Sequence, residues 1–237
     1  VIFQLIKSSM FLNNYNFDTL YPEILTIGTY TEFAPFSYES EDEIIGSDLV
    51  FLRQFAQSIG YKISIITMNF SELWEAPNQN KCDIAAAGIM ARNDRDIGIH
   101  AKWSNPYSEV YRSLLVRKDD THIFNSLSNL LNKKIVVTPD STAHIDAIDR
   151  YVPIGAQILP FVESQEKVII ELLENKIDAF AEGNISNEFL KNKYGGSLLS
   201  LCDLHVMDEK ETLNFVVRAH SDHLWEYLNY FISSNQY

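Results

Sequence analysis

The chain has 237 residues, enough for two lobes of about 100 residues each, and 46% of them are hydrophobic. A substantial core is therefore possible, which excludes an intrinsically disordered chain. The 32 acidic and 19 basic residues give a net charge of -13, which argues against nucleic acid or an anionic membrane surface as partners. The structural interpretation of this charge is that it keeps a monomer soluble. The functional interpretation is that it attracts a cationic ligand.

Two further features bear on the compartment. Cys82 and Cys202 form no disulfide framework and no CxxC motif, so we expect two free thiols or one optional bridge. No apolar run approaches the roughly 20 residues that span a bilayer. The N-terminal stretch lacks a long apolar core and a small-residue cleavage site. It either follows a removed signal peptide or marks an edge of the chain, and both interpretations stay open.

From residue 24 the chain alternates between strand-like and helix-like runs. The clearest helix places Leu52, Phe55 and Ala56 at the i, i+3, i+4 spacing of an apolar face, and Gly60 ends it. The expected elements are strands at 24–30, 61–68 and 83–88 and helices at 46–59 and 70–78, the last broken near Pro77. This order is typical of a sheet covered by helices.

A second α/β series follows without internal repeats. The expected strands lie at 110–116, 134–138, 157–161, 177–181 and 213–217, and the expected helices at 126–131, 142–151, 164–174, 186–192 and 223–233. Two similar α/β halves joined by short β-like segments predict two lobes with a cleft between them. Clefts of this kind are where small ligands bind.

Two arginines follow the buried strand that ends at Gly88. Asn93 and Asp94 predict the start of a helix there, and an arginine in the first turn opposes the helix dipole. The planar fork of Arg95 or Arg92 becomes useful if it binds a carboxylate. The other interpretation is a surface ion pair with one of three nearby acids, Asp94, Asp96 and Asp48. The residues alone favour neither.

A second candidate site combines hydroxyl groups with aromatic rings. Ser141 and Thr142 stand at the start of the helix at 142–151, where one hydroxyl can cap the helix while the other binds an anion. The loop at 29–40 holds four aromatic residues, Tyr30, Phe33, Phe36 and Tyr38. We expect Phe36 and Tyr38 to complete the core and Phe33 to stack over a ligand.

Motifs of common hydrolases, zinc proteases and P-loop proteins are absent. His220 and His223 form a metal-like pair without a clear third ligand, so we expect a solvated surface there. Glu182 follows an apolar strand and is expected to face the region between the lobes.

Several short motifs occur in a recognisable order. They are Gly28 in the first strand, APF at 34–36, GSD at 46–48, DIAAAG at 83–88, RNDR at 92–95, WSNPY at 103–107, DST at 140–142 and DA at 178–179. Together with the closing helix they resemble the extracellular solute-binding proteins of family 3, the polar amino-acid receptors of bacterial ABC transporters. The resemblance covers roughly residues 24–233.

The resemblance implies a two-lobe α/β fold of the type II periplasmic-binding-protein class that closes like a flytrap over a central cleft. The expected ranges are 24–115 plus 213–237 for lobe 1, 117–212 for lobe 2 and 1–23 for an N-terminal extension, with hinge strands near 115–117 and 213–216. It also implies a secreted monomer in the periplasm or outside the cell. The partners it implies are a small carboxylate ligand such as an amino acid and a membrane permease, with no cofactor, metal or nucleic acid.

The resemblance further assigns roles to single residues. Arg95 would clamp the ligand carboxylate, Thr142 and Ser141 would help from the other lobe, and aromatic rings would flank the ligand. The expected ligand-binding set is Arg95, Thr142, Ser141, Phe33, Phe70, Ala87, Gly88, Met90, Glu182 and Tyr30. No catalytic residue is expected of a receptor.

The chain departs from the family pattern at the amine-binding position. Family members that bind α-amino acids place an aspartate five residues after the position of Asp178, and this chain has Gly183 there. Either Glu182 replaces that aspartate, or the ligand has no α-ammonium group. Three further departures are Met90, Arg92 and Asp140, which suggest an atypical ligand and a second anion contact by Arg92.

An enzymatic branch of the same fold, the cyclohexadienyl or arogenate dehydratases, is also similar to this chain. These enzymes eliminate water and carbon dioxide with a carboxyl group as general acid, which requires a raised pKa. Glu182 is the candidate for that acid, although the position of the branch's own acid aligns near Ser186. A sensor or regulatory module of the same fold is the third interpretation.

Overall fold

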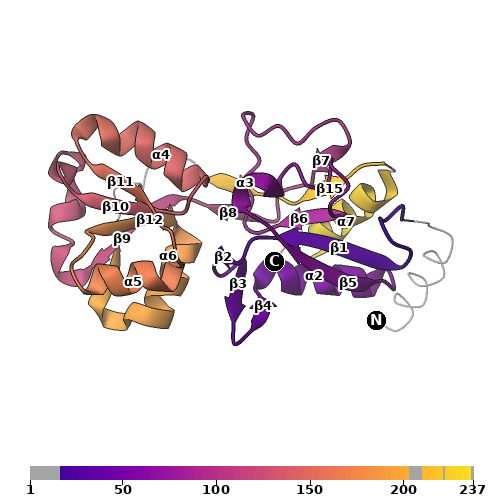
Figure 1. Ribbon diagram of the computed structural model, residues 1–237, viewed down its shortest axis with the longest axis horizontal. Helices are drawn as coiled ribbons and strands as arrows, with labels where there is room; N and C mark the ends of the chain where they lie inside the picture. Colours follow the sequence, from indigo (N-terminus) through magenta and orange to yellow (C-terminus); the bar gives the residue numbers. More distant parts are fainter. Residues whose placement is uncertain (1–16, 203–209, 221, 236–237) are drawn as a thin grey trace.

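The structure is a computed structural model that describes residues 17–202, 210–220 and 222–235. Two lobes lie along the long axis of the molecule, and each is built on its own five-stranded sheet (Figure 1). Among the described residues, no helix combines the length and the hydrophobicity needed to cross a membrane. Cys82 and Cys202 are both buried and are not joined by a disulfide.

Lobe 1 contains a mixed sheet in the order β5-β1-β6-β15-β7. The central strand β1 pairs in parallel with β5 and β6, and β15 runs antiparallel to β6 and β7. The elements are β1 (Ile24–Thr29), α2 (Ser47–Ser58), β5 (Lys62–Thr67), α3 (Phe70–Leu73), β6 (Ile84–Ala86), β7 (Ala101–Trp103), β15 (Val216–Arg218) and α7 (Asp222–Ser234). The expected strands at 24–30, 61–68 and 83–88 and the expected helices at 46–59 and 223–233 are confirmed, with ends shifted by a few residues. The expected helix at 70–78 ends already at Leu73, and the expected strand at 213–217 is divided into two short strands.

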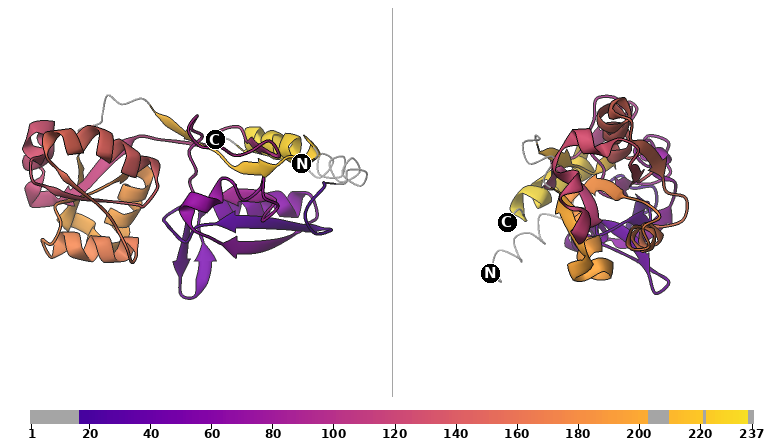
Figure 2. Two further views of the ribbon diagram at one scale, coloured as in Figure 1. Left: turned by 45° about the horizontal axis from the view of Figure 1, so that its top comes forward. Right: turned by 90° about the vertical axis from the view of Figure 1, so that its left-hand side faces the viewer.

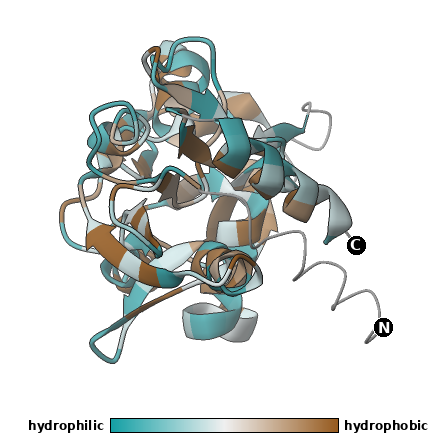
Figure 3. Cartoon of the chain, turned by 90° about the vertical axis from the view of Figure 1, so that its right-hand side faces the viewer, coloured by the Kyte–Doolittle hydropathy of each residue, from teal (hydrophilic) through white to brown (hydrophobic). Residues whose placement is uncertain are grey.

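Apolar periodicity explains how the helices cover this sheet. Leu49, Leu52 and Phe55 of α2 are buried against the strands, as are Leu224 and Leu228 of α7. Burial of each such side chain contributes about 1.5–3 kcal/mol. Figure 3, which looks onto this lobe, shows hydrophobic and hydrophilic residues alternating along the amphipathic helices.

The segment before β1 belongs to this core as well. Phe17 is buried and packs edge-on against Tyr61, 5.8 Å between ring centroids. Phe17, which falls within the expected N-terminal extension at 1–23, therefore packs into the lobe 1 core. Residues 1–16 lie outside the described part of the chain.

Lobe 2 contains a sheet in the order β11-β10-β12-β9-β13, in which β10 is parallel to β11 and β12 and β9 is antiparallel to β12 and β13. Its elements are β9 (Arg112–Arg117), β10 (Lys134–Val137), α4 (Thr142–Tyr151), β11 (Gln157–Pro160), α5 (Gln165–Leu173), β12 (Ala179–Gly183), α6 (Asn184–Leu190) and β13 (Leu199–Cys202). Shorter helical turns are η1 (Lys118–Asp120), η2 (Ile123–Asn125), η3 (Leu127–Leu130), η4 (Val152–Ile154), η5 (Lys191–Gly195) and η6 (Gly196–Leu198).

Two short strands carry the chain between the lobes. β8 (Ser108–Val110) pairs antiparallel with β14 (Glu211–Leu213), and Figure 2 shows β14 and the segment before β9 running from one lobe to the other. The first hinge strand was expected near 115–117. That position is wrong, because all of β9 is hydrogen-bonded into the lobe 2 sheet, so residues 112–115 belong to the second sheet rather than to lobe 1.

A small three-stranded sheet projects from lobe 1 toward lobe 2. It consists of β2 (Glu32–Phe33), β3 (Ser37–Ser40) and β4 (Glu43–Ile45), paired in the order β2-β3-β4. Phe36 is buried and Tyr38 is partly buried, so the expectation that both complete the core is confirmed. We call this small sheet the β2–β4 hairpin; its β2 end lies beside α6 of lobe 2 (Figure 1).

Candidate functional site

Arg95 lies in a loop rather than at the start of a helix. Residues 91–100 form turns: Arg95 N–H donates to Arg92 O (3.2 Å), and Gly98 N–H donates to the Asp96 carboxylate (2.8 Å). The predicted helix at Asn93 is therefore wrong, because local side-chain hydrogen bonds of this kind compete with helix formation. The loop turns Arg95 inward, and its side chain is buried.

The guanidinium group of Arg95 is held by backbone oxygens and aromatic rings. Nη1 donates to Met90 O at 2.9 Å, and Nη2 lies 3.5 Å from Asp140 O, which belongs to lobe 2. The group stacks over Trp74, 4.6 Å from the ring centroid, and lies 5.4 Å from Phe70. Burial, followed by repulsion from Arg92, lowers the pKa of Arg95 to about 10.

Arg95 has no carboxylate partner among the described residues, whereas Arg92 has one. Nε of Arg92 bonds the Asp94 carboxylate at 2.8 Å on an exposed surface. The interpretation of a surface ion pair is therefore confirmed for Arg92 and wrong for Arg95. A buried cation without an anionic partner is unfavourable by itself, so Arg95 is suited to receive one.

The two hydroxyl groups at the start of α4 have different surroundings. Ser141 Oγ accepts from His144 N–H at 3.1 Å, which confirms the capping interpretation. Thr142 Oγ1 is buried and has no hydrogen-bond partner in the described structure. Thr142 lies two residues after Asp140, and the Asp140 carbonyl oxygen is the lobe 2 atom that Arg95 approaches. The unpaired hydroxyl of lobe 2 is thus close in sequence to a backbone group that contacts the lobe 1 cation.

Aromatic rings form one wall near Arg95. Phe70 contacts Tyr30 (5.6 Å), Phe33 (5.6 Å, edge-on) and Trp74 (5.9 Å) through their ring centroids. Burial, together with the negative charges of Glu32, Glu182 and Asp140, raises the pKa of Tyr30 to about 12, so its hydroxyl stays protonated and can donate. Trp74 was missed by the sequence analysis, although its position four residues after Phe70 on a helical run was a signal.

The backbone between Ala87 and Met90 is fixed from behind. Gly88 has φ +58°, and a Cβ atom there would stand 2.7 Å from the Phe36 ring, so the tight contact requires glycine. Gly88 N–H donates to Asp48 Oδ2 at 2.8 Å. Ala87 was expected to contact the ligand. Its side chain is fully buried in the lobe 1 core instead of facing solvent.

Glu182 is the penultimate residue of β12, and its carboxylate is buried among polar partners. Its side chain is 2% exposed; Oε2 accepts from Thr138 Oγ1 (2.7 Å), Oε1 accepts from Gly183 N–H (2.9 Å) and lies 3.6 Å from Arg112 Nη1. Burial raises the pKa of Glu182, while Arg112 and the two hydrogen bonds oppose that shift. The carboxylate is therefore already bonded by the protein itself.

Arg112 is a second site arginine that the sequence analysis missed. It is 6% exposed, and its Nε and Nη2 both bond Glu211 Oε2 (2.6 and 2.5 Å), while Nη2 lies 3.7 Å from Met90 Sδ. Arg112 thereby joins lobe 2 to the hinge strand β14 and to lobe 1. An arginine inside the apolar run at 110–116 was a usable signal, since a charge in a buried strand needs partners.

These residues together can bind a small carboxylate. Arg95 supplies a cation without a carboxylate partner among the described residues, Thr142 an unpaired hydroxyl and Tyr30 a protonated phenol, and aromatic rings form one wall beside them. For the enzymatic alternative, Ser186 is buried and donates its hydroxyl hydrogen to Ala34 O at 2.6 Å, so this position carries no acid. Glu182 is the one acid of the expected set.

The chain matches the profile of the bacterial extracellular solute-binding proteins, family 3, over residues 25–236. It is 29% identical to the arginine-binding extracellular protein ArtP of Bacillus subtilis over 116 residues, which are 48% of this chain and 43% of that protein. It is 24% identical to a probable histidine-binding protein of Campylobacter jejuni over 113 residues, 48% and 43% of the two chains. The matched stretches thus span less than half the length of these relatives.

Solved structures of low sequence identity share the fold. One is an amino-acid ABC transporter substrate-binding protein of Streptococcus pneumoniae bound to L-arginine, with a TM-score of 0.77, 20% identity and coverage of 90% and 88% of the two chains. Another is an ancestral amino-acid-binding protein described as a precursor of cyclohexadienyl dehydratase, with a TM-score of 0.74, 22% identity and coverage of 90% and 89%. The two lobes, their sheets and the family match lead to one conclusion: the chain belongs to the bacterial extracellular solute-binding proteins of family 3.

Proposed function

We propose that this chain is the substrate-binding protein of an ABC transporter and that it binds an amino acid between its lobes, with the α-carboxylate on Arg95. The observation that carries the proposal is the buried guanidinium of Arg95, which has no carboxylate partner among the described residues and faces lobe 2 at Asp140. A bidentate pair between arginine and carboxylate is the strong, planar contact that fits this group.

L-arginine is the first ligand to test. Two relatives of the chain are described as arginine-binding or arginine-bound, the net charge of -13 attracts a cation, and the aromatic wall suits a guanidinium group. The Glu182 carboxylate, which is the candidate partner of the ligand ammonium, is already bonded by Thr138, Gly183 and Arg112. The deaminated analogue of arginine therefore separates the two open interpretations of that position.

Isothermal titration with L-arginine, its deaminated analogue and agmatine, which lacks the carboxylate, tests the proposal. We expect L-arginine to bind and agmatine not to bind. Arg95→Ala should weaken binding by about thirtyfold or more, since loss of a buried charged contact costs about 2–5 kcal/mol. Arg92→Ala is the matched control, because Arg92 pairs with Asp94 at the surface.

Equal affinity of the wild type and Arg95→Ala would show that the carboxylate binds elsewhere. Equal binding of arginine and its deaminated analogue would show that the site does not recognise an α-ammonium group. A thermal unfolding scan of each variant confirms that the protein is folded, and we expect little destabilisation because burial disfavours the charged form of Arg95.

The cellular setting follows from the family rather than from a site. We propose that the chain acts outside the cytoplasmic membrane, as a monomer, and delivers its ligand to a membrane permease after the lobes close. The family description as extracellular solute-binding proteins supports this location. Co-purification with candidate permeases in the presence and absence of ligand tests the partner.

A dehydratase activity is the second candidate, because one observation favours it. Burial raises the pKa of Glu182, which is the property that a general acid needs. Incubation with prephenate and with arogenate, followed by chromatography of aromatic products, tests it directly. Turnover that disappears in Glu182→Gln would establish an enzyme. Unchanged substrate after prolonged incubation would exclude the dehydratase, and the receptor function would be the remaining candidate.

A further inference from the structure

Ala34, in the β2–β4 hairpin of lobe 1, contacts lobe 2 through both of its backbone polar groups. Ala34 N–H donates to Gln165 Oε1 at 2.9 Å, and Ala34 O accepts from Ser186 Oγ at 2.6 Å. Gln165 is the first residue of α5, and Ser186 lies in α6. The backbone N–H and C=O of one lobe 1 residue, which belong to two successive peptide groups, are therefore both bonded by side chains of lobe 2.

This contact is buried as completely as the interior of either lobe. Ala34 is 4% exposed, Gln165 3% and Ser186 1%. Ala34 also packs with the apolar core of lobe 2, a cluster that contains Leu115 and Val168. A buried peptide group needs its partners, so closing the lobes without Gln165 or Ser186 would leave Ala34 N–H or Ala34 O unsatisfied.

Further contacts surround this residue. The Glu32 carboxylate accepts from Gln165 N–H at 3.3 Å, so an acid of lobe 1 lies at the N-terminus of a lobe 2 helix. The rings of Tyr38 and Phe189 are 5.3 Å apart, and Lys193 Nζ lies 4.9 Å above the Tyr38 ring. We call the contacts of Ala34 with Gln165 and Ser186 the Ala34 clasp.

Gln165 and Ser186 lie outside the set of residues to which we assign ligand contacts, although Ala34 directly follows Phe33 of that set. The covalent connections of the lobes run through β8 and β14 instead. The free energy of the clasp therefore favours closed lobes regardless of the ligand's chemistry. Any closed-state population in the free protein changes the apparent ligand affinity in proportion.

We propose that Gln165 and Ser186 are positioning residues that hold the lobes closed through the Ala34 backbone and thereby set how fast a bound ligand leaves. The link to ligand release rests on the proposed function; the closure itself does not. One neutral hydrogen bond is worth about 1 kcal/mol, which is about a fivefold change in an equilibrium constant. Gln165 Nε2 has no partner within the described structure, which offsets part of the gain and keeps the closed state reversible.

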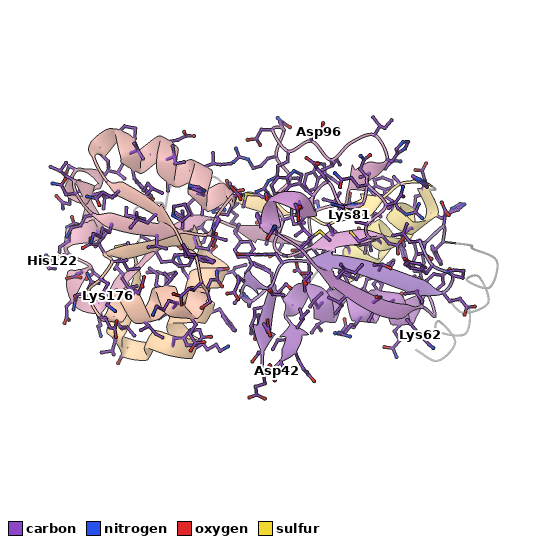
Figure 4. All side chains as sticks on the ribbon, viewed as in Figure 1. Asp42, Lys62, Lys81, Asp96, His122 and Lys176 are labelled. Carbon is purple, nitrogen blue, oxygen red and sulfur yellow. The ribbon has the colours of Figure 1, made fainter. Side chains whose placement is uncertain are left out.

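The first experiment measures lobe closure without any ligand. Spin labels at Lys62→Cys and Lys176→Cys, exposed positions on the two lobes (Figure 4), report the distance between the lobes by electron double resonance. Cys82 and Cys202 are buried and stay unlabelled; burial raises the pKa of Cys82 to about 12. We expect a short-distance population in the wild type.

Variants then remove each half of the clasp. Ser186→Ala and Gln165→Leu should each lower the ratio of closed to open protein about fivefold, and the double variant should lower it further. One variant removes the partner of Ala34 N–H and the other removes the partner of Ala34 O. Either variant alone therefore tests the clasp if the other fails to fold. Ser200→Ala, a partly buried serine within lobe 2 whose hydroxyl contacts only Leu201 O, is the control and should leave the ratio unchanged.

The same variants are then tested with bound L-arginine by stopped-flow. We expect the dissociation rate to rise about fivefold in each single variant, with a smaller change in association. A wild type without a short-distance population, or identical distance distributions in wild type and clasp variants, overturns the proposal. If the wild type binds no amino acid, the proposed function fails while the ligand-free distances still decide whether the clasp holds the lobes.

Discussion

Ser141 and Thr142 are neighbours with different tasks. The Ser141 hydroxyl accepts from His144 N–H and so caps α4. The Thr142 hydroxyl is buried and bonds nothing in the described structure, which costs free energy unless a ligand completes it. The Ser141 hydroxyl therefore contributes to stability, whereas the Thr142 hydroxyl is available to contribute to binding.

We expect Thr142→Val to weaken ligand binding about five- to tenfold and to leave the free energy of unfolding unchanged or slightly higher. Val keeps the size of the side chain and removes only an unpaired polar group. Ser141→Ala should do the reverse: about 1 kcal/mol of stability is lost with the cap, and the affinity stays within about threefold. Urea unfolding and calorimetric titration of both variants measure the two quantities.

The pair of variants is informative because each is the control of the other. A loss of stability in Thr142→Val with full affinity would show that the hydroxyl acts within the fold. A large loss of affinity in Ser141→Ala would place Ser141 on the ligand, as the family resemblance first implied.

At the scale of elements, Asp48 joins α2 to the loop after β6. Its Oδ2 accepts from Gly88 N–H and from Tyr107 Oη, both at 2.8 Å, while Oδ1 is buried without a partner. Burial raises the pKa of Asp48 from its ordinary 3.8 to about 7, against the effect of the two hydrogen bonds. The carboxyl group thus holds the backbone at Gly88, beside Met90, and its burial there makes its ionised form less favourable.

The sign of the pH dependence follows from that pKa. Between the unfolded value near 3.8 and the folded value of about 7, the folded protein binds more protons than the unfolded chain, so stability falls as the pH rises. Asp48→Asn removes this dependence and keeps both accepted hydrogen bonds. We expect the stability of the variant relative to the wild type to increase by about 1 kcal/mol per pH unit between pH 5 and 7.

Urea unfolding of both proteins at pH 5, 6 and 7 measures this difference. Asp42→Asn is the control, because Asp42 is exposed at the tip of the β2–β4 hairpin (Figure 4). Parallel stability curves of the wild type and Asp48→Asn would mean that Asp48 does not carry the dependence.

At the scale of the whole molecule, the net charge of -13 attracts cations over a distance that salt shortens. The Debye length falls from about 30 Å at 0.01 M salt to about 3 Å at 1 M. A cationic ligand should therefore associate faster than a neutral one of the same shape at low salt.

We expect the association rate of L-arginine to fall several-fold between about 0.01 M and 0.5 M salt and that of a neutral isostere, L-citrulline, to stay nearly constant. Stopped-flow fluorescence of the tryptophan signal provides both rates. Equal salt dependence for the two ligands would show that the charge of the whole molecule does not guide the ligand.

Much of this protein was predictable from local patterns. The alternation of apolar residues predicted the strands and helices of both lobes, and the capping role of Ser141 followed from its place before α4. The order of short motifs predicted the family and hence the fold. The start of a helix at Asn93 was wrong because turns stabilised by side chains prevailed there, and the first hinge was misplaced because strand pairing is not local.

Only the tertiary structure decided which distant groups meet. Arg112 meets Glu211, and Ala34 meets Gln165 and Ser186, across 99, 131 and 152 residues of sequence. Periodicity reports which face of an element is buried, but not which other element buries it. The sequence by itself therefore determined the elements, the family and the candidate arginine. The pairing of Glu182 with Arg112, the unpaired hydroxyl of Thr142 and the Ala34 clasp arose from packing two lobes together, where each buried polar group must find a partner through space.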